Sequence, residues 1–595
     1  MRKSVTYVNE SLRQESCIDY VLVSDPHEVI DYMVTAPDIN FSDHLPLTVV
    51  VKCDVYDNDA KLRYSAKPAQ LQLRWDKGDA MSFYQYTGNF LMPLLVEVEE
   101  MLLLCSERNS LKLHQTDLTA FVDRIYSEIV CVLTNAANAY VPAYRKIFFK
   151  FWWNEELSIL KEASVESNKL WKAAGKPRAG QIFDKRQSCR LRYRRRIKEC
   201  ERNNTEIYTN ALHEALVHKN STEFWKSWRS KFESVNKCQQ VEGCVDSDII
   251  AGKFCDHFMK AYTFNSECRA KELQETYSTM RESYCGFPIT DNQHFDTEWV
   301  SRIIFDMKRG KAADIYGLTA EHLQYSHPVI SVLLSKFFLL MVVSHCIPNG
   351  FKRSYIVPIS KVKDCRTKAM SCDDFRGIAI SPILSKVFEH CLLKQLQALI
   401  GSNDNQFGFK KGLGCSHAIY TVRNIVDRWV SRGCTANLCA IDLSKAFDKV
   451  NHHALYVKLM KRNIPVQLLE IIENLFSGCH SCIKWGDSWS VEFKIAYGVR
   501  QGSVLSPFLF AIYVDDVCGL CKPGCNLFVI LYADDILLLS PTVTALEKLL
   551  HACERELNWL DMVINCKKSF CLRIGPRYDT QCQLNSTQFI DVWQL

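Results

Sequence analysis

The sequence predicts an α+β protein in which three stretches of different texture follow one another. Residues 1–52 contain short pieces, at 18–23 and 46–51, that alternate apolar and polar side chains as β-strands do. From about residue 53 to 290 the chain has long runs of helical periodicity with few glycines or prolines. From about residue 300 onward, helical and strand patterns alternate. We therefore predict a β-rich region at 1–52, a mainly helical, basic region at 53–290 and a mixed region at 291–595.

The length of 595 residues exceeds what one compact core usually organises, so we expect about two to four domains. The composition, 47% hydrophobic and 24% charged, is ordinary for a soluble protein. The net charge of +6 is small for this length and indicates a polyanionic partner only where positive charge is clustered. The longest apolar run, near 337–343, is interrupted by Lys336 and His345, so we expect no membrane partner.

The 27 cysteines are scattered, and the first residues, MRKSVTYVNE, contain no apolar segment typical of a secretory signal. We therefore expect reduced thiols and an intracellular protein. Cys518, Cys521 and Cys525 have a spacing that could suit zinc, but no clear fourth ligand accompanies them. Ordinary loop cysteines are the favoured interpretation.

A strongly basic tract lies at residues 185–202, where nine Lys and Arg side chains stand against Glu199 and Glu201. One interpretation is a solvated helix face. The other is nucleic-acid contact through Arg194, Arg195, Arg196 and Lys198, with aromatic stacking by Tyr193, Trp225 and Trp228. The interleaving of aromatic and cationic side chains favours nucleic-acid contact.

Two segments of the last half present carboxylates at the ends of apolar runs. In residues 438–450 (LCAIDLSKAFDKV) a strand pattern leads directly into Asp442. In residues 527–540 (LFVILYADDILLLS) two apolar runs flank Asp534 and Asp535, which predicts the turn of a β-hairpin. Unpaired carboxylates there need a cation, and carboxylates from neighbouring strand ends suit paired Mg²⁺ ions.

An Asp-Asp pair by itself is more often a simple turn former. Asp515 and Asp516 provide a comparison within the chain, because they follow PFLFAIYV, a helical pattern. We predict that this second pair ends a helix and has no metal role.

Three segments taken together resemble the reverse transcriptases. Residues 532–535 (YADD) are similar to the catalytic hairpin of that family, and Asp442 with Phe447 to its first metal-binding strand. Residues 498–507 (GVRQGSVLSP) are similar to its nucleotide-contacting loop. Their order and spacing are those of the family, so the joint match is far more specific than YADD alone.

Further segments resemble the LINE-type (non-LTR) retrotransposon branch, and together the matches run from about 300 to 575, roughly half of the chain. The matching segments are 310–314 with 321–323, the fingers strands 355–361 and 374–378, the insertion 406–409, and Asn565, Lys568 and Ser569 after the hairpin. The resemblance implies the fingers and palm of a right-hand polymerase, with an antiparallel palm sheet and packed helices.

The resemblance also assigns roles to residues of the site. Asp442 and Asp534 would be the principal metal ligands with Asp535 nearby, and Gln501 and Gly502 would shape the nucleotide pocket. Lys361 and Arg376 would contact the incoming triphosphate, although a solvated lysine is a competing interpretation for Lys361. Phe447 would sense the sugar, although a core aromatic is the default for such a residue without the motif.

Residues 1–52 resemble the last motifs of the endonuclease that these elements carry. By this likeness His44 contacts the scissile phosphate, Asp19 orients the imidazole and Asp43 assists the nucleophile or metal. A domain usually needs about 100 residues or more, and the metal-binding Asn and Glu motifs of that family are missing, so we expect no nicking. The thumb and the Cys/His-rich tail are likewise not recognisable, and the chain resembles an element truncated at both ends.

The resemblance implies an RNA-directed DNA polymerase that uses two Mg²⁺ ions, for which Mn²⁺ could substitute, to transfer dNTPs onto a primer 3′-hydroxyl. Its partners would be an RNA template and a DNA primer or target, and its location the nucleus and cytoplasm if the element is active. The oligomeric state stays open. The rival hypothesis is a catalytically silent remnant that only binds nucleic acid. The intact carboxylates favour the enzyme, and the missing ends favour the remnant.

The basic tract generates a first testable prediction. Neutralising three of Arg194, Arg195, Arg196 and Lys198 should lower nucleic-acid affinity and flatten its dependence on salt, by roughly 0.7–0.9 log units per lost phosphate contact. The measurement is fluorescence anisotropy of a labelled RNA–DNA duplex across a salt series. An unchanged slope would return the tract to the solvated-helix interpretation.

Overall fold

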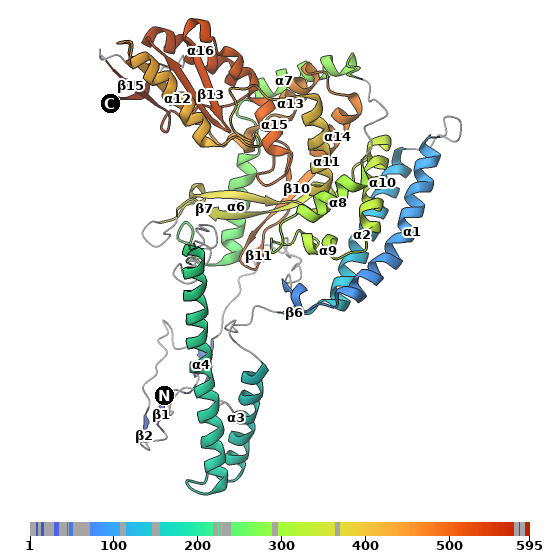
Figure 1. Ribbon diagram of the computed structural model, residues 1–595, viewed down its shortest axis with the longest axis vertical. Coiled ribbons are helices and arrows are strands. Elements are labelled where there is room, and N and C mark those ends of the chain that lie inside the picture. Colours follow the sequence, from blue (N-terminus) through green and yellow to red (C-terminus); the bar gives the residue numbers. More distant parts are fainter. Residues whose placement is uncertain are drawn as a thin grey trace. The chain divides into compact units, whose positions relative to one another are not determined.

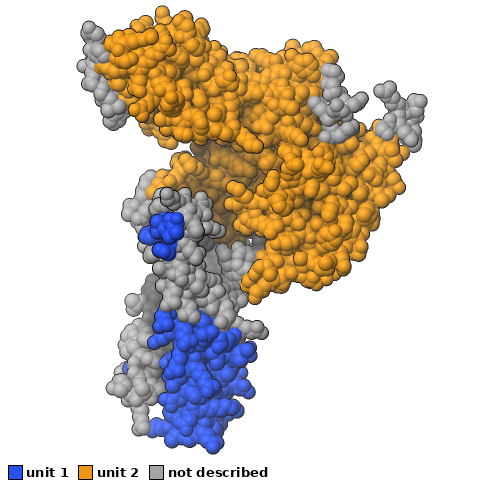
Figure 2. Space-filling model, viewed as in Figure 1, with its two compact units in different colours: residues 1–63, 146–236 blue, residues 64–145, 237–595 orange. Residues whose placement is uncertain are grey.

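The computed structural model describes residues 72–106, 115–144, 155–217, 240–287, 295–362 and 369–575, with short pieces at 7–9, 14–16, 29–34, 45, 47–51, 224, 228, 582–583 and 589–594. The described chain forms two compact units, residues 1–63 with 146–236 and residues 64–145 with 237–595 (Figure 2). It mixes helices and sheets, as the sequence predicts (Figure 1).

The first unit contains a pair of long helices and two small strand pairs. Helices α3 (Glu155–Ala173) and α4 (Gln181–Val217) pack along each other (Figure 1). The antiparallel strand pairs are β1 (Tyr7–Asn9) with β2 (Gln14–Ser16), and β3 (Val29–Val34) with β4 (Leu47–Val51). Strand β4 confirms the pattern at 46–51, while 18–23 lies outside the described residues.

The basic tract lies on α4, and the structure corrects one expectation about it. Tyr193 is only 5% exposed, because it packs with Ile197 and Cys200 against Leu157 and Leu160 of α3. The expectation that Tyr193 stacks on nucleic-acid bases is therefore wrong. Its spacing to Ile197 and Cys200 is that of a helix face buried on a neighbour.

The cations of the tract divide into two groups. Arg194, Arg195 and Lys198 are exposed. Arg196 instead pairs with Glu156 of α3 at 2.7 Å and with Glu199 at 3.1 Å. The exposed three are therefore the better set for the salt experiment. Trp228 is 39% exposed, and Trp225 lies outside the described residues.

The second unit contains two sheets and most of the helices. Helices α1 (Ala80–Ser106), α2 (Gln115–Tyr140), α6 (Ser247–Ala261) and α7 (Glu267–Glu282) belong to it, although they lie within the predicted region 53–290. The predicted domain boundaries at residues 52 and 290 remain predictions. The short antiparallel pair of β5 (Gln72–Leu73) and β6 (Ala143–Tyr144) brings together the segment before α1 and the segment after α2.

The first of these sheets has the strand order β11-β10-β7-β8, and β12 pairs with β10. Its strands are β7 (Arg353–Ser360), β8 (Phe375–Ile380), β10 (Cys479–Trp485), β11 (Ser488–Trp489) and β12 (Phe493–Ile495). Strands β7 and β8 lie at the segments 355–361 and 374–378, where strands are expected, and they pair antiparallel. Phe254 and Phe258 of α6 pack on this sheet in a core that includes Ile356 and Phe375.

The second sheet has the order β13-β14-β9-β15-β17-β16 and is antiparallel except for the parallel pair β15–β17. Its strands are β9 (Ala436–Ile441), β13 (Phe528–Tyr532), β14 (Asp535–Ser540), β15 (Phe570–Ile574), β16 (Cys582–Gln583) and β17 (Phe589–Gln594). Helix α12 (Cys415–Val430) covers one face and α16 (Val543–Trp559) the other. Neighbouring residues Leu438 and Cys439 of β9 belong to the two different cores, because strand side chains alternate between faces.

The second unit has further helices besides an apolar helix, α10 (Val329–Ser344), whose Leu333, Leu334, Phe337 and Phe338 are fully buried. These helices are α8 (Thr297–Asp306), α9 (Ala320–Gln324), α11 (Ile383–Leu399), α13 (His452–Lys461), α14 (Val466–Phe476) and α15 (Ser506–Tyr513). The apolar run 337–343 thus belongs to a protein core. In the part of the chain that is described, no helix combines the length and apolarity needed to cross a membrane.

Short 3-10 helices connect several elements: η2 (Trp75–Lys77), η3 (Asn349–Lys352), η4 (Cys372–Asp374), η5 (Ala446–Lys449), η6 (Asp515–Leu520) and η7 (Pro523–Cys525).

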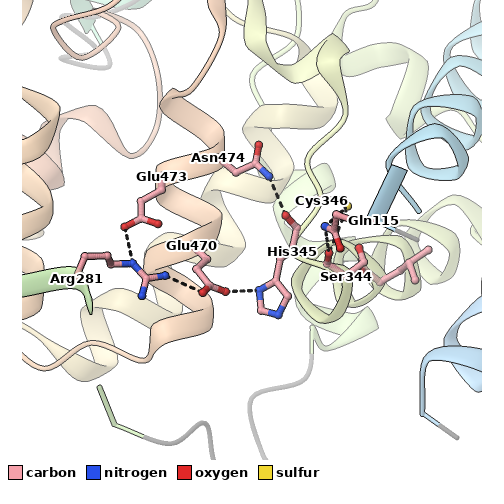
Figure 3. Close-up of polar contacts among 9 residues, drawn as sticks. Gln115, Arg281, Ser344, His345, Cys346, Glu470, Glu473 and Asn474 are labelled. Carbon is pink, nitrogen blue, oxygen red and sulfur yellow. Dashed lines mark hydrogen bonds and ion pairs between the residues drawn. The ribbon is translucent and has the colours of Figure 1, made fainter. Parts of the chain in front are cut away.

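A polar network links helices α7, α14, α10 and α2 (Figure 3). Arg281 of α7 pairs with Glu470 at 2.7 Å and with Glu473 at 3.2 Å, both on α14. Glu470 also lies 2.6 Å from Nδ1 of His345, which ends α10 in a left-handed conformation. Two hydrogen bonds extend the network: Gln115 Nε2 to Ser344 O and Asn474 Nδ2 to His345 O, each 2.8 Å.

Candidate active site

The structure brings three of the predicted carboxylates together at the ends of neighbouring strands of the second sheet. Asp442 directly follows β9, as its apolar run predicts, and Ile441 pairs with Ile536 of β14. Continuing this antiparallel register by one residue puts Asp442 opposite Asp535, and directly opposed residues have Cβ atoms about 4.5–5.5 Å apart. Asp534 lies in the two-residue turn between β13 and β14, as the hairpin prediction requires.

The charges of these carboxylates act on one another. Burial, followed by the charges of Asp534 and Asp442, raises the pKa of Asp535 above its ordinary value. Like charges disfavour ionisation of each other, so the arrangement is costly unless a cation joins it. The cation closest at hand is Lys568, whose Nζ lies 3.9 Å from Asp442 Oδ2.

The comparison pair Asp515 and Asp516 has a different environment. Both follow helix α15, as its apolar pattern predicts, and begin η6. Arg462 pairs with Asp515 at 2.8 Å, and the buried Lys458 pairs with Asp516. These carboxylates are neutralised by protein cations, which explains their presence without a metal.

Asp442 is held in place by residues 565–569, the segment after the hairpin. Asn565 Nδ2 donates to Asp442 Oδ2 (3.1 Å), and the Asn565 backbone N–H donates to the Asp442 carbonyl (2.8 Å). The Asp442 N–H in turn donates to Ser569 Oγ at 3.1 Å. One oxygen of the Asp442 carboxylate is thus oriented by an amide, while Oδ1 has none of these contacts.

The carboxylates can be tested for their fit to a divalent cation. Among the residues that the structure describes, no group of three or more His, Cys, Asp or Glu side chains is placed so that it forms a cage that could hold a metal ion. Mg²⁺ rarely uses such a cage, because it keeps several waters and takes one or two carboxylates together with substrate phosphates. Hard carboxylate oxygens that repel one another at neighbouring strand ends suit that mode of binding.

A group of cations lies beside the carboxylates. The pKa of Lys361 is lowered by burial and by the positive charges of Lys568 and Arg376, so these three side chains share one neighbourhood. Lys361 Nζ donates to the Asp373 carbonyl at 2.6 Å, and its backbone N–H to the Asp374 carbonyl at 2.8 Å. Arg376 is exposed on β8. The two predicted triphosphate contacts are therefore brought together with a lysine that touches Asp442.

The loop 498–506 lies against strand β8, and Gly502 is required there. Gly502 has φ +127°, and a Cβ on it would lie 2.4 Å from the Ala379 carbonyl oxygen. Only glycine combines this conformation with such a close approach. The neighbouring Gln501 carbonyl accepts the Ala379 N–H at 2.7 Å, and Gln501 Nε2 donates to Asp448 Oδ1 at 3.0 Å.

Glu389 of α11 is a residue that sequence reasoning missed. It is 1% exposed, and its Oε2 accepts hydrogen bonds from the Ser503 hydroxyl, from Val504 N–H (2.8 Å) and from Leu505 N–H (3.2 Å). A buried carboxylate that accepts several such bonds orders the donors. The signal in the sequence is an acid between apolar residues, VFEHCLL, since the donors from the loop lie more than a hundred positions away.

Arg500 fixes the other end of the loop. It is 7% exposed and donates to the Phe351 carbonyl at 3.1 Å and to Cys479 Sγ at 3.0 Å. Glu389 and Arg500 therefore bracket the segment that carries Gln501 and Gly502.

Phe447 lies on η5 with its ring held between two others. The ring stacks on Phe510 with centroids 4.6 Å apart and planes 13° apart, and Phe409 meets its edge at 6.0 Å. Phe447 is half-buried, so one side remains accessible. Packing on Phe510 agrees with a core aromatic and also supplies the rigidity that a sugar sensor needs.

The structure does not place the other predicted site residues at this site. Asp19, Asp43 and His44 lie outside the described residues. Arg194, Arg195, Arg196 and Lys198 belong to the first compact unit, and their role in nucleic-acid binding stays a prediction.

Comparison with known proteins agrees with this geometry. Residues 361–587 match the family described as reverse transcriptase (RNA-dependent DNA polymerase). The probable RNA-directed DNA polymerase from transposon X-element of Drosophila melanogaster is 28% identical over 402 residues, 64% of this chain and 39% of that protein. The corresponding polymerase from transposon BS of Drosophila melanogaster is 22% identical over 548 residues, 88% of this chain and 55% of that protein.

A third relative is the Retrovirus-related Pol polyprotein from type-2 retrotransposable element R2DM of Drosophila melanogaster. It is 26% identical over 223 residues, 36% of this chain and 21% of that protein. The matched regions thus span between about a fifth and about half of the length of these relatives.

Asp448, the acceptor for Gln501, generates a prediction about pH. Burial raises its pKa from 3.8 to about 6, so the folded protein binds this proton more tightly than the unfolded chain. The resulting stabilisation is present below about pH 4 and is lost as the pH rises through about 6. Asp448→Asn keeps an acceptor for Gln501 and removes this loss, so at pH 7 the variant should be more stable by up to about 3 kcal/mol.

The measurement is the unfolding midpoint of both proteins between pH 4 and 7, with the exposed Asp427→Asn as the control. The advantage of Asp448→Asn should vanish near pH 4. Parallel curves over the whole range would show that Asp448 is not a destabilising buried charge.

Proposed function

We propose that this chain, whose residues 361–587 are a reverse transcriptase domain, is an RNA-directed DNA polymerase of a non-LTR retrotransposon. The observation that carries the proposal is the convergence of Asp442, Asp534 and Asp535 at the ends of β9 and β14. The pairing of those strands assembles carboxylates from distant parts of the sequence. By contrast, Asp515 and Asp516 are paired with the protein cations Lys458 and Arg462.

The reaction is nucleotidyl transfer. The 3′-hydroxyl oxygen of a primer forms a bond to the α-phosphorus of a dNTP, the bond between the α-phosphorus and its bridging oxygen breaks, and pyrophosphate leaves with the electron pair. Asp442, Asp534 and Asp535 would hold Mg²⁺, or Mn²⁺ in its place, which when bound lowers the energy of the charge on the attacking and leaving oxygens. The proton of the 3′-hydroxyl passes to solvent.

The protein's own groups supply binding and alignment. Lys361 and Arg376 offset the charge of the triphosphate, where fixed cations cost no reorganisation. Gln501 and Gly502 form the floor of the nucleotide pocket, and the hydrogen bonds of Glu389 and Arg500 keep that floor rigid. Alignment of hydroxyl and phosphate by such groups accounts for much of the rate of this kind of reaction.

The two sheets of the second unit divide the work in this proposal. The sheet with β7 and β8 serves as the fingers, since Arg376 lies on β8 and Lys361 follows β7. The sheet with β9, β13 and β14 serves as the palm. RNA template and DNA primer are the partners, and the nucleus and cytoplasm the compartments. Residues 1–52 are proposed as a remnant of the associated endonuclease on the resemblance of Asp19, Asp43 and His44.

Primer extension tests the proposed polymerase activity. An RNA template annealed to a DNA primer should be extended with dNTPs and Mg²⁺, and Asp534→Asn should lower the rate about a thousandfold or more, because the metal contributes several kcal/mol of transition-state stabilisation. Asp427→Asn, an exposed acid on α12, is the matched control. Failure of the unsubstituted chain to extend a primer that it binds would instead support the silent nucleic-acid-binding remnant.

Phe447 yields a prediction about sugar choice. A rigid ring stacked on Phe510 leaves no room for a 2′-hydroxyl, the group that distinguishes ribonucleotides. Phe447→Ala should therefore admit ribonucleotides while dNTP incorporation falls less, because a steric clash is removed. The measurement is incorporation efficiency for matched dNTP and rNTP pairs, with the exposed Phe570→Ala as the control. An unchanged preference would make Phe447 a core aromatic.

A further inference from the structure

The turn that carries Asp534 contains a residue in an unfavourable backbone conformation. Ala533 has φ +61°, in the left-handed region that residues with a Cβ avoid. Asp534 follows directly, so the direction of its carboxylate depends on how firmly this conformation is held. Strain of this kind persists only where the surroundings enforce it.

A segment outside the hairpin enforces it. Residues 405–408 run beside β13: the Phe407 N–H donates to the Leu531 carbonyl at 2.8 Å, and the Leu531 N–H donates to the Asn405 carbonyl at 2.9 Å. These bonds form a parallel bridge between Gln406 and Leu531. The outer edge of the hairpin is therefore paired just before the turn begins.

The side chain of Gln406 then holds the turn itself. It is fully buried, at 0% exposure, and its Oε1 accepts the Ala533 N–H at 3.1 Å while its Nε2 donates to the Ala533 carbonyl at 3.3 Å. The same Oε1 accepts the Gly408 N–H at 2.9 Å. One amide thus contacts both polar groups of the strained residue, and a carboxylate or an apolar side chain could not do so.

Gly408 allows this close approach. A Cβ on Gly408 would lie 2.3 Å from Ala533 N and 2.9 Å from Ala533 Cα, closer than atoms can come without a shift of backbone. The two residues therefore act together: Gly408 brings the segment against the turn, and Gln406 supplies the hydrogen bonds.

We propose that Gln406 is a positioning residue that keeps Ala533 left-handed and so aims the Asp534 carboxylate at the reaction site. The inference deepens the proposed function and rests on it where it concerns catalysis. Gln406 itself contacts neither substrate nor carboxylate, because both of its polar atoms are occupied by backbone groups.

The first arm of the experiment measures the turn without catalysis. Gln406→Met has nearly the same length and no polar groups. Hydrogen exchange followed by mass spectrometry should show faster exchange of the Ala533 amide, by about tenfold or more, in a peptide that covers 531–535. Protection of β9 should not change, and Gln397→Met, the same substitution at an exposed position of α11, is the control.

The second arm measures primer extension. Gln406→Met should lower kcat about 10- to 100-fold, the range expected when a catalytic group is displaced by about 1 Å, with little change in KM for the primer–template. Ala533→Gly in that background should recover about threefold or more of the lost rate, since glycine adopts the left-handed turn without help. A loss of rate through general unfolding would not be recovered by this change.

The outcomes separate the two proposals. Unchanged hydrogen exchange at 531–535 in Gln406→Met would show that Gln406 does not hold the turn, whatever the activity of the variant. Faster exchange with an unchanged kcat overturns the positioning role, and so does a loss of rate that Ala533→Gly leaves untouched. If the unsubstituted chain extends no primer, the proposed polymerase function fails, while the exchange arm still decides whether Gln406 holds the turn.

Discussion

Mutual repulsion of three carboxylates at the ends of neighbouring strands is the constraint on which the rest of the site depends. Pairing of β9 with β14 forces Asp442 and Asp535 into opposition, and the charges of Asp534 and Asp442 raise the pKa of Asp535. Backbone hydrogen bonds of a sheet supply the free energy that holds like charges together. The carboxylates therefore carry negative charge that a divalent cation would neutralise. In the proposed function, the triphosphate would bind to that cation.

A second layer of buried polar groups keeps the first in place. Glu389 orders the loop that carries Gln501, Asn565 orients Asp442, and Gln406 contacts the backbone of Ala533. Each of these groups has hydrogen-bond partners within the protein, which is the usual reason that a polar group is tolerated inside a protein. They hold these segments in a fixed geometry, which the proposed alignment of a hydroxyl with a phosphate would require.

The partners of each carboxylate also separate the acids of the proposed site from those that are ion-paired within the fold. Asp515 and Asp516 lie near the same core, but Lys458 and Arg462 neutralise them at short range. Among the residues that the structure describes, the Asp442 carboxylate is paired with a lysine at 3.9 Å and accepts from an amide. The sequence pattern already separates the two pairs, since one follows a helical run and the other lies between two strand runs. The partners of the charges agree with that distinction.

The sequence by itself determined the local elements that carry the site. An apolar run that ends at Asp442, two apolar runs around Asp534 and Asp535, and the segments at 355–361 and 374–378 became strands and a hairpin, because alternation and turn residues act within a few positions. It also specified Gly502, where both φ and close contact exclude a side chain.

Only the tertiary structure decided which distant residues meet. The register of β9 on β14, the contacts of Glu389 and Gln406, and the burial of Tyr193 against α3 link segments that are far apart in the chain or on different faces of an element. A tyrosine among arginines looks available for stacking until the neighbouring helix covers it. Whether a side chain is buried, paired or free depends on surfaces that come together on folding, and local sequence patterns carry no record of those partners.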